Sequence, residues 1–428
     1  MKYMKAIGID IGTTSICGVV TDAKSGKVLK SVTKNSDAFI SDCQPFEKIQ
    51  SVGKIMSTAD SILEELLDED ICVIGVTGQM HGIVYTDKDG NAVSPLYTWQ
   101  DGRGDIPYKG TTYAKYLGGA TGFGCVTDLY NRENGIRPSE AVSFCTIHDY
   151  FVMRLCGLTS PVIHTSDAAS FGCFDIEKLQ FTNGLELEVT KDFKIAGRYK
   201  NIPVSVAIGD NQASVFSCIK EGDLLLNFGT GSQISAISDR IVTGENIETR
   251  PYFGGKYLVV GAALCGGRAY SVLRDFYSEI LGYAGDFDSE QVYAFMDKML
   301  KKQPSSPMVC DTRFAGTRSD SSIKGSITGI TTENFTASNL TYAVLSGMVD
   351  ELYGMFEGKG INYKNLAGSG NGIRKNPSLV RIAEEKFGAK MKIPAHLEEA
   401  AVGAAMFGLV ANGNIDDIDK ASELIKYN

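Results

Sequence analysis

Near its start the chain reads AIGIDIGTTS over residues 6–15, and the apolar run ICGVV follows over residues 16–20. An apolar strand that stops at Asp-x-Gly-Thr-Thr and then resumes predicts a tight hairpin. At its tip Gly12 lets the backbone approach a ligand closely, and Thr13 and Thr14 offer N–H and O–H donors. Asp10 would repel a bare phosphate but attract one that carries a magnesium ion. The stretch therefore predicts a site for a metal-bridged nucleotide.

The same pattern recurs once, as LLLNFGTGS at residues 224–232. Asn227 takes the place of Asp10, and the tip consists of Gly229, Thr230 and Gly231. A single glycine-bearing hairpin carries little meaning, because short motifs often match by chance. Two copies in opposite halves of one chain predict duplicated α/β domains that face each other across a cleft.

The bulk composition sets further bounds. At 428 residues the chain is too long for one ordinary core, so we expect an N-terminal domain over residues 1–209 and a C-terminal domain over residues 210–428. With 43% hydrophobic and 22% charged residues, the chain falls in the class of soluble globular proteins. A net charge of −9 argues against a nucleic-acid or acidic-membrane partner, which would demand basic patches.

The ten cysteines contain no Cys-x-x-Cys pair, which argues against a zinc knuckle or a disulfide framework. They predict reduced, mostly buried thiols in a cytoplasmic protein. No apolar run approaches the roughly 20 residues that span a bilayer, so we expect no membrane insertion.

Two polar clusters follow in the first half. After a helix expected to start at Pro45, the apolar run at residues 71–76 predicts a buried strand, and polar residues follow it, where open α/β sheets place ligands. The first cluster is Gln79, Met80 and His81, although His81 could simply be a hydrogen-bonded turn histidine. The second contains Trp99 and Asp101: an indole can stack on a sugar ring, but a lone tryptophan can also anchor a core.

Asp210 follows another buried strand, at residues 203–209, and precedes a helix expected over residues 211–218. An aspartate in that place is commonly a helix N-cap. Because it also lies just ahead of the second glycine hairpin, we expect it to face the cleft.

His148, Asp149, His164 and Asp167 include metal-ligating residue types, but their spacing matches no metal motif. We therefore expect solvated or hydrogen-bonded roles and no zinc site.

Late in the chain, the strand at residues 365–367 ends in a glycine-rich turn that has room for a flat base or ribose. The turn contains Gly368, Ser369, Gly370 and Asn371. It is no dinucleotide fingerprint, because its spacer to the next helix is too long. A small-residue helix at residues 398–408 is expected to pack beneath it.

In this order the motifs resemble those of the FGGY carbohydrate kinases, members of the actin-like ATPase superfamily with two ribonuclease-H-like domains. The resemblance covers nearly the whole chain. Residues 79–82 are similar to xylulose kinases and related ketose kinases. The segments at 98–103, 121–125, 146–150 and 166–170 are more similar to sedoheptulose kinases, and the segment at 207–215 fits both.

The resemblance implies a role for each matching residue. Asp210 would be the general base, Asp10 the magnesium-linked aspartate, and ATP would lie on Gly12–Thr14, Gly229–Gly231 and Gly368–Asn371. The implied sugar contacts are Gln79, Met80, His81, Trp99, Asp101, Asp210 and Asn211. One departure is Cys17, which stands where relatives usually carry Lys or Arg near the γ-phosphate.

The implied activity is ATP- and Mg²⁺-dependent phosphorylation of a ketose at its terminal primary hydroxyl, with sedoheptulose as the expected substrate, by a monomer or homodimer. Xylulose is the alternative sugar. An actin-like or chaperone-like ATPase that transfers nothing to a sugar, or a sugar-binding regulator without catalysis, would also fit the two hairpins. Loss of the basic residue at Cys17 is what favours the regulator.

Overall fold

The computed structural model describes residues 4–300, 308–317, 320 and 322–428. The chain divides into two compact units, and each is built on its own mixed sheet. The first unit comprises Met1–Ser217, Arg250–Lys256 and His396–Lys426, and the second comprises Cys218–Thr249, Tyr257–Ala395 and Tyr427–Asn428. This division differs from the predicted boundary after residue 209, because three later segments belong with the first unit.

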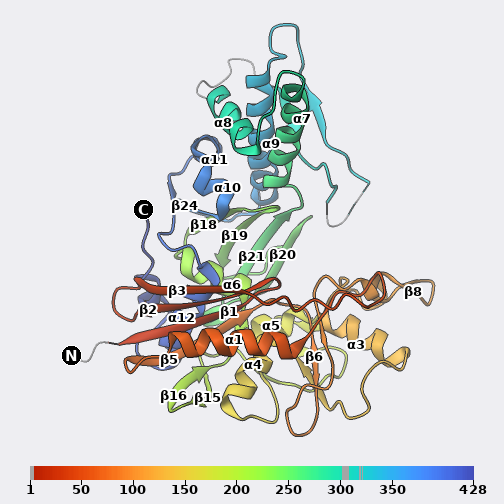
Figure 1. Ribbon diagram of the computed structural model, residues 1–428, viewed down its shortest axis with the longest axis vertical. Helices are drawn as coiled ribbons and strands as arrows, with labels where there is room; N and C mark the ends of the chain where they lie inside the picture. The colour runs from red at the N-terminus through yellow and green to blue at the C-terminus, as the bar shows by residue number, and fades with distance from the viewer. Residues whose placement is uncertain (1–3, 301–307, 318–319, 321) are drawn as a thin grey trace. The chain divides into compact units, whose positions relative to one another are not determined.

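A seven-stranded sheet forms the centre of the first unit, in the order β15-β16-β5-β1-β2-β3, and β17 also pairs with β5 (Figure 1). The predicted hairpin at residues 6–20 is confirmed as antiparallel β1 and β2. The strands of the seven-stranded sheet are β1 (Lys5–Ile11), β2 (Ser15–Asp22), β3 (Val28–Asn35), β5 (Ile71–Gly78), β15 (Ile195–Tyr199), β16 (Ile202–Ser205) and β17 (Ile208–Gly209).

Helices cover the sheet and continue some of its strands. The prediction that the first helix begins at Pro45 is wrong. Ile49–Gln50 form the short strand β4, and α1 begins at residue 52, where the Ser51 side chain is its N-cap. The helices of this unit are α1 (Val52–Leu66), α2 (Tyr113–Tyr116), α3 (Gly124–Glu133), α4 (Ile147–Cys156), α5 (Thr165–Ser170), α6 (Asp210–Cys218), α12 (Glu399–Ala411), α13 (Ile418–Ser422) and the 3₁₀ turn η1 (Gly102–Asp105).

Short two-stranded pairs connect these helices to the sheet. The pairs are β4 with β7 (Leu96–Tyr97), β6 (Val84–Thr86) with β10 (Ser143–Cys145), β8 (Pro107–Tyr108) with β9 (Thr111–Thr112), β11 (Val162–His164) with β14 (Glu188–Thr190), and β12 (Phe174–Asp175) with β13 (Gln180–Phe181).

Helices α1 and α12 pack on opposite faces of the sheet. Successive residues of a strand point to opposite faces, and a Cβ at Gly18 would meet side chains of α1, whereas a Cβ at Gly8 would meet the Ala401 carbonyl of α12. Gly18 pairs with Ile9, the neighbour of Gly8, so the two contacts lie on different faces. Figure 1 shows α1 running along one of them.

Helix α12 belongs to the first sheet and not to the glycine turn at residues 368–372, so that expectation was wrong. A Cβ added at Gly8 or Gly75 would lie 1.8 Å from a carbonyl oxygen of α12, and one at Gly403 would lie 1.9 Å from the Ala213 oxygen of α6. Backbone therefore touches backbone at three places. The small residues that suggested close packing do pack closely, against β1, β5 and α6.

The second unit has a six-stranded sheet in the order β20-β21-β19-β18-β24-β25, and its central hairpin, β18 with β19, confirms the predicted repeat. The strands of this sheet are β18 (Asp223–Phe228), β19 (Ser232–Ser238), β20 (Ile247–Pro251), β21 (Tyr257–Ala263), β24 (Asn365–Ser369) and β25 (Met391–Lys392), and β22 (Val309–Asp311) and β23 (Ser326–Thr328) form a separate pair. The 3₁₀ turn η2 (Phe253–Gly255), between β20 and β21, belongs to the first unit. The helices of the second unit are α7 (Gly267–Gly282), α8 (Ser289–Met299), α9 (Ala337–Phe356), α10 (Gly370–Lys375) and α11 (Pro377–Phe387).

Each unit has a hydrophobic core of its own, formed by its sheet and the helices beside it. No helix within the described residues combines the length and the apolar run that crossing a membrane requires.

We expect Gly75→Ala to lower the free energy of unfolding of the first unit by about 3 kcal/mol, because its methyl group would overlap the Ala404 carbonyl oxygen. Urea unfolding followed by the fluorescence of Trp99, the single tryptophan, measures this unit. The control is Gly53→Ala in α1, whose Cβ would meet only Ser51 Oγ at 3.9 Å, and which should leave the stability unchanged or raise it by up to about 1 kcal/mol. Equal midpoints for Gly75→Ala and wild type would contradict the close packing.

Candidate active site

Three parallel strand ends bring the two principal carboxylates of the first unit together. Asp10 of β1 pairs with Thr77 of β5, and Thr77 pairs with Ile208 of β17. The next row joins Ile11, Gly78 and Gly209 in the same way. Asp210 follows as the first residue of α6. Both carboxylates therefore lie at the carboxyl edge of the sheet, where open α/β sheets bind ligands.

Asp210 is half-buried, and its Oδ1 accepts a hydrogen bond from Asn211 Nδ2 at 3.3 Å. Burial raises its pKa, while the charges of His148 and Arg250 lower it. The strand before it is held at Gly209, whose N–H donates to Ser166 Oγ at 3.0 Å. The chain thus keeps a carboxylate at this edge and supplies two cationic side chains that favour its ionised, proton-accepting form.

Asp10 has the features of a metal-linked carboxylate. Burial and the charge of Asp210 raise its pKa to about 7, and His148 opposes that shift. Its Oδ1 is buried and has no hydrogen-bond partner among the described residues. A buried carboxylate oxygen without a partner fits a hard cation such as Mg²⁺, which binds oxygen ligands and would favour the ionised form.

Thr13 joins the first hairpin to the two predicted polar clusters. Its Oγ1 accepts from Trp99 Nε1 at 3.0 Å and donates to Gln79 Oε1 at 3.3 Å. Its carbonyl accepts from Gln50 Nε2 at 2.6 Å, and Gln50 Oε1 accepts from Gln79 Nε2 at 3.0 Å. Trp99 is 45% exposed, so it is no core anchor, and its indole lies at the tip of the hairpin.

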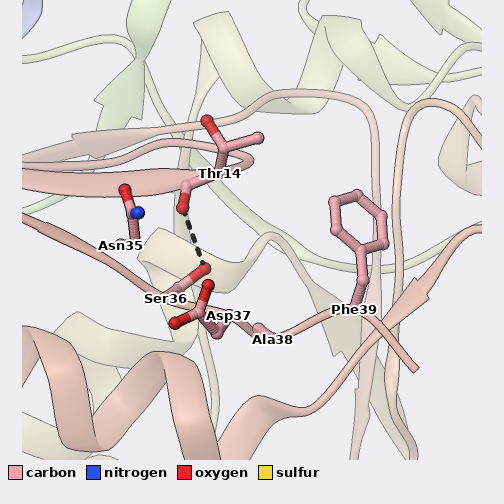
Figure 2. A pocket seen from close by; sticks show the side chains of 6 residues that line it. All are labelled: Thr14, Asn35, Ser36, Asp37, Ala38 and Phe39. Atoms are coloured by element: carbon pink, nitrogen blue, oxygen red, sulfur yellow. Dashed lines mark hydrogen bonds between the residues drawn. The ribbon is translucent and has the colours of Figure 1, made fainter. Parts of the chain in front are cut away.

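A pocket of about 380 Å³ opens beside Thr14, the exposed residue of the same tip (Figure 2). The chain after β3 forms its other wall, where Ser36 Oγ donates to the Thr14 carbonyl at 3.4 Å. Asp37 and Phe39 complete the lining. An acidic side chain disfavours phosphate, so this pocket is not suited to a phosphate group, and the contacts of Gly12–Thr14 with phosphate stay a prediction.

Met80 and His81 lie directly after β5, beside the segment that leads to Asp210. A Cβ at Gly209 would lie 2.7 Å from Met80 Sδ, which shows how closely the thioether packs there. His81 has a φ of 72°, a conformation that is uncommon outside glycine. Its N–H donates to Ser170 Oγ at 3.1 Å, its Nδ1 is 2.8 Å from the Ser170 carbonyl, and its ring stacks on Phe123 at 4.6 Å. The turn therefore holds the imidazole in one orientation.

Asp101 has a structural environment, unlike the sugar contact predicted for it. Its carboxylate is fully buried, forms an ion pair with Arg103 at 2.6 Å and accepts from the Lys48 N–H at 3.0 Å. Arg103 is itself fully buried. We expect this buried pair to fix the loop that carries Trp99.

The structure brings together three of the four residues that were considered as metal ligands. Ligand atoms of His148, Asp149 and Asp167 lie within 4.8 Å of one another, and His148 Nε2 is 3.0 Å from Asp167 Oδ1. Burial alone would lower the pKa of His148, but these carboxylates and Asp210 raise it to about 9. The 3.0 Å contact and the raised pKa describe His148 and Asp167 as a buried ion pair.

His148 fits at this position because Gly78 has no side chain. A Cβ at Gly78 would lie 2.9 Å from His148 Nδ1. Thr146 caps α4 by accepting from the Asp149 N–H, and its hydroxyl donates to Asp149 Oδ2 at 2.7 Å. The fourth residue, His164, is buried elsewhere as the cap of α5, and burial lowers its pKa to about 4.

Cys17 pairs with Asp10 across the hairpin and lies on the same face of the sheet. Burial raises the pKa of its thiol to about 12, and the neighbouring charges are those of Glu398 and Asp10. A neutral thiol beside two carboxylates supplies no positive charge for a phosphate. The replacement of the usual Lys or Arg by Cys17 therefore removes a positive charge from this part of the sheet.

The second unit repeats the strand-end geometry with neutral side chains. Asn227 pairs with Ser369 across parallel β18 and β24, and its Nδ2 donates to Ser369 Oγ at 2.7 Å. Gly229 and Thr230 are exposed, and their carbonyls accept from the first N–H groups of α7 at 2.8–3.1 Å. These hydrogen bonds hold the loop that precedes Gly231 against the start of a helix.

The glycine turn after β24 is only partly accessible. Gly368 and Ser369 are buried inside the strand, whereas Gly370 begins α10 with a φ of 81° and Asn371 is exposed. A Cβ at Gly370 would lie 2.6 Å from the Phe228 oxygen, so the turn needs a glycine there. Gly370 and Asn371 are thus the accessible part of the predicted adenosine site.

Sequence reasoning missed Gln50, Phe123 and the role of His148. Gln50 gave no signal, because it lies outside every motif and acts only through the fold. Phe123 lies in the segment 121–125 that carries part of the resemblance, but nothing there indicated its contact with His81. A hydrogen-bonded role was expected for His148, but not its pairing with Asp167, because that residue lies on a different helix.

Comparisons with known proteins show the family of the chain. Residues 5–106 match the family model for the N-terminal domain of the FGGY family of carbohydrate kinases, and residues 224–412 match the model for its C-terminal domain. The chain is 28% identical over 465 residues to the sedoheptulokinase of Homo sapiens, covering 94% of this chain and 96% of that protein. It is 23% identical over 476 residues to the xylulose kinase of Lactococcus lactis subsp. lactis, covering 99% and 90%.

Among solved structures, the gluconate kinase of Lactobacillus acidophilus superposes with a TM-score of 0.83 at 18% identity. The match covers 100% of this chain and 93% of that chain, so the two share a fold along their length.

The ion pair predicts a specific dependence of stability on pH. The pKa of His148, about 9, exceeds the ordinary 6.5, so its stabilising contribution is complete below pH 6.5 and disappears as the pH rises through 9. Between pH 7.5 and 9.5 we expect wild type to lose about 2 kcal/mol that His148→Gln does not lose. His164→Gln, which removes a histidine that is neutral over this range, should retain the wild-type slope. Urea unfolding at several pH values, followed by Trp99 fluorescence, distinguishes them, and equal slopes in all three would contradict the ion pair.

Proposed function

The chain belongs to the FGGY family of carbohydrate kinases, and from that premise we propose that it phosphorylates sedoheptulose at its terminal primary hydroxyl, giving sedoheptulose 7-phosphate. The likeness to a sedoheptulokinase over 94% of the chain supports this choice of sugar. The observation that carries the chemistry is the placement of Asp210 at the strand edge beside Asp10. A partner-regulated ATPase that transfers nothing to a sugar, considered from the sequence, is excluded by the family.

We assign the first unit to the sugar and the second to the nucleotide. In the first unit, Met80 and His81 follow the buried strand β5, and Trp99 stands exposed at the hairpin tip. These side chains offer an apolar surface and polar groups for a polyhydroxylated chain. In the second unit, Gly229, Thr230 and Asn371 are the exposed members of the two glycine loops.

Asp210 acts as the general base. As the terminal hydroxyl of the ketose attacks the γ-phosphorus of ATP, a carboxylate oxygen of Asp210 accepts its proton, the new O–P bond forms, and the bond to the β–γ bridging oxygen of ADP breaks. Burial raises the pKa of this carboxylate, and the charges of His148 and Arg250 favour its ionised form. Asn211, through its hydrogen bond to Oδ1, holds one carboxylate oxygen in place.

Asp10 is the residue that would hold a magnesium ion, through the buried oxygen that has no partner among the described residues. When bound, the ion supplies charge neutralisation for the phosphates. Gly12 and Thr13 would offer N–H donors to the same phosphates. Because Cys17 supplies no positive charge, we expect backbone donors to carry more of the γ-phosphate binding.

Xylulose is the second candidate substrate. It is favoured by the match of residues 79–82 to xylulose kinases and by the 23% identity to a xylulose kinase over 99% of the chain. Both sugars present the same terminal primary alcohol to Asp210. Sedoheptulose and xylulose differ in chain length, so residues beyond His81 and Trp99 would have to distinguish the longer sugar from the shorter one.

Replacing the base tests the catalytic assignment. Asp210→Asn keeps the shape of the side chain but accepts no proton, so we expect kcat to fall by about 10²–10⁴-fold. The dissociation constant for ATP, measured by calorimetry, should change less than about twofold, because the nucleotide loops are untouched. Asp419→Asn, an exposed aspartate of α13, is the control that should keep full activity. Wild-type turnover in Asp210→Asn would refute the assignment.

A coupled assay of ADP release across sedoheptulose, xylulose, ribulose, fructose and glycerol tests the sugar. We expect kcat/KM for sedoheptulose to exceed that for every other acceptor by about tenfold or more, a difference of about 1.4 kcal/mol in transition-state binding. A lead for xylulose would establish the second candidate. A lead for glycerol would remove ketoses altogether.

A further inference from the structure

We propose that Cys125 and Cys173 form a redox modification site, at which a low-molecular-weight disulfide converts the two thiols into an intramolecular disulfide. All ten cysteines are free thiols in this structure. This pair differs from the rest in geometry, accessibility and position beside the proposed sugar site.

The two thiols already contact each other. Cys125 lies at the start of α3, where its N–H donates to the Phe171 carbonyl at 2.9 Å and its Sγ lies 3.4 Å from the Gly172 oxygen. Its side chain hydrogen-bonds to that of Cys173, the next residue. Gly172 and Cys173 take φ values of 77° and 51°, so the chain turns sharply at this point. Because Cys125 Sγ lies against the carbonyl of the residue before Cys173, the two cysteines are neighbours in the fold, as a disulfide requires.

The two sulfurs are suited to different steps. The hydrogen bond from Cys125 lowers the pKa of Cys173 to about 7, and Cys173 is half-buried, so an accessible thiolate is present at neutral pH. Cys125 is buried at 3% exposure, with a raised pKa, and keeps its proton. By contrast, burial raises the pKa of five other cysteines: Cys17, Cys72, Cys145, Cys156 and Cys310.

The chemistry balances as two thiol–disulfide exchanges. The Cys173 thiolate attacks one sulfur of the reagent RSSR, the S–S bond breaks, and RS⁻ leaves with the proton lost by Cys173 to give RSH. The Cys125 thiol then loses its proton and attacks Cys173 Sγ in the mixed disulfide, releasing a second RSH. Overall, two protein thiols are oxidised by two electrons and one RSSR is reduced to two RSH.

The disulfide would join two segments that hold His81. Phe123, two residues before Cys125, stacks on the His81 ring, and Ser170, three residues before Cys173, binds the His81 N–H and Nδ1. A Cβ at Gly122 would lie 2.0 Å from the Trp99 oxygen, so the same loop also touches Trp99. Shortening the distance between the two sulfurs to a covalent bond moves both supports of the imidazole.

The expected effect on catalysis, which rests on the proposed function, is weaker sugar binding in the oxidised enzyme. We expect the KM for the ketose to rise by at least about fivefold, and the KM for ATP to change by less than about twofold, because the second unit is untouched. The expected effect on Trp99, which does not depend on turnover, is a changed emission spectrum.

The test equilibrates the full-length protein with mixtures of glutathione and glutathione disulfide. Peptide mapping measures the Cys125–Cys173 link, Trp99 fluorescence measures the loop, and ketose KM is measured with the sugar that the reduced enzyme phosphorylates best. Cys173→Ser should keep the basal KM and lose the response to glutathione disulfide, and Cys125→Ser should stop at the mixed disulfide. Cys72→Ser, which removes a half-buried thiol in β5, should respond as wild type does.

A linked peptide whose formation parallels a dithiothreitol-reversible change in KM and in emission supports the proposal. Absence of the linked peptide overturns the site, and a linked peptide without either change overturns its effect on the loop. An enzyme that phosphorylates no ketose overturns the proposed function alone, since the linked peptide and the Trp99 emission still decide the redox site.

Discussion

The charge of one buried imidazole governs the carboxyl edge of the first sheet. Asp10, Asp149, Asp167 and Asp210 surround this edge, and each would raise the pKa of its neighbours if left alone. A protonated His148, paired with Asp167 at 3.0 Å, offsets part of that repulsion. Buried charges are tolerated where they are paired, so the positive charge of His148 favours the ionised form of the half-buried Asp210 beside it. The catalytic proposal for Asp210 depends on that balance.

Glycines decide which elements can reach the edge. Gly78 admits His148 from α4, and Gly8 and Gly75 admit α12 on the opposite face of the sheet. A Cβ would lie 2.9 Å from His148 Nδ1 at Gly78 and 1.8 Å from a carbonyl oxygen of α12 at Gly8 or Gly75, all closer than ordinary van der Waals contact. The redox pair depends on a similar freedom, because Gly172, with its left-handed φ, turns the chain that carries Cys173 toward α3.

Local patterns predicted much of the fold and of the site. The two hairpins, the buried strand before Gln79 and the aspartate at the start of α6 all followed from apolar runs and glycines. Contacts between distant segments did not follow. The hydrogen bond from the Lys48 N–H to Asp101, the link from Gln50 to Thr13 and the packing of α12 depend on which elements meet, and no spacing along the chain encodes that. Composition suggested close packing for α12 but not its partner.

The position of α12 between the first sheet and α6 also affects the order in which the chain can fold during synthesis. Domains generally fold as units while the chain emerges from the ribosome. The hydrophobic core of the second unit is drawn from residues 224–393, so all of its core residues have been translated before α12 begins. The first unit must hold β1 and β5 with one face uncovered until residue 411 has been translated, because only then can α12 cover Gly8 and Gly75. The earliest strands to be made are therefore among the last to be covered. Between the synthesis of β5 and that of α12, we expect chaperones to bind the uncovered face of the sheet.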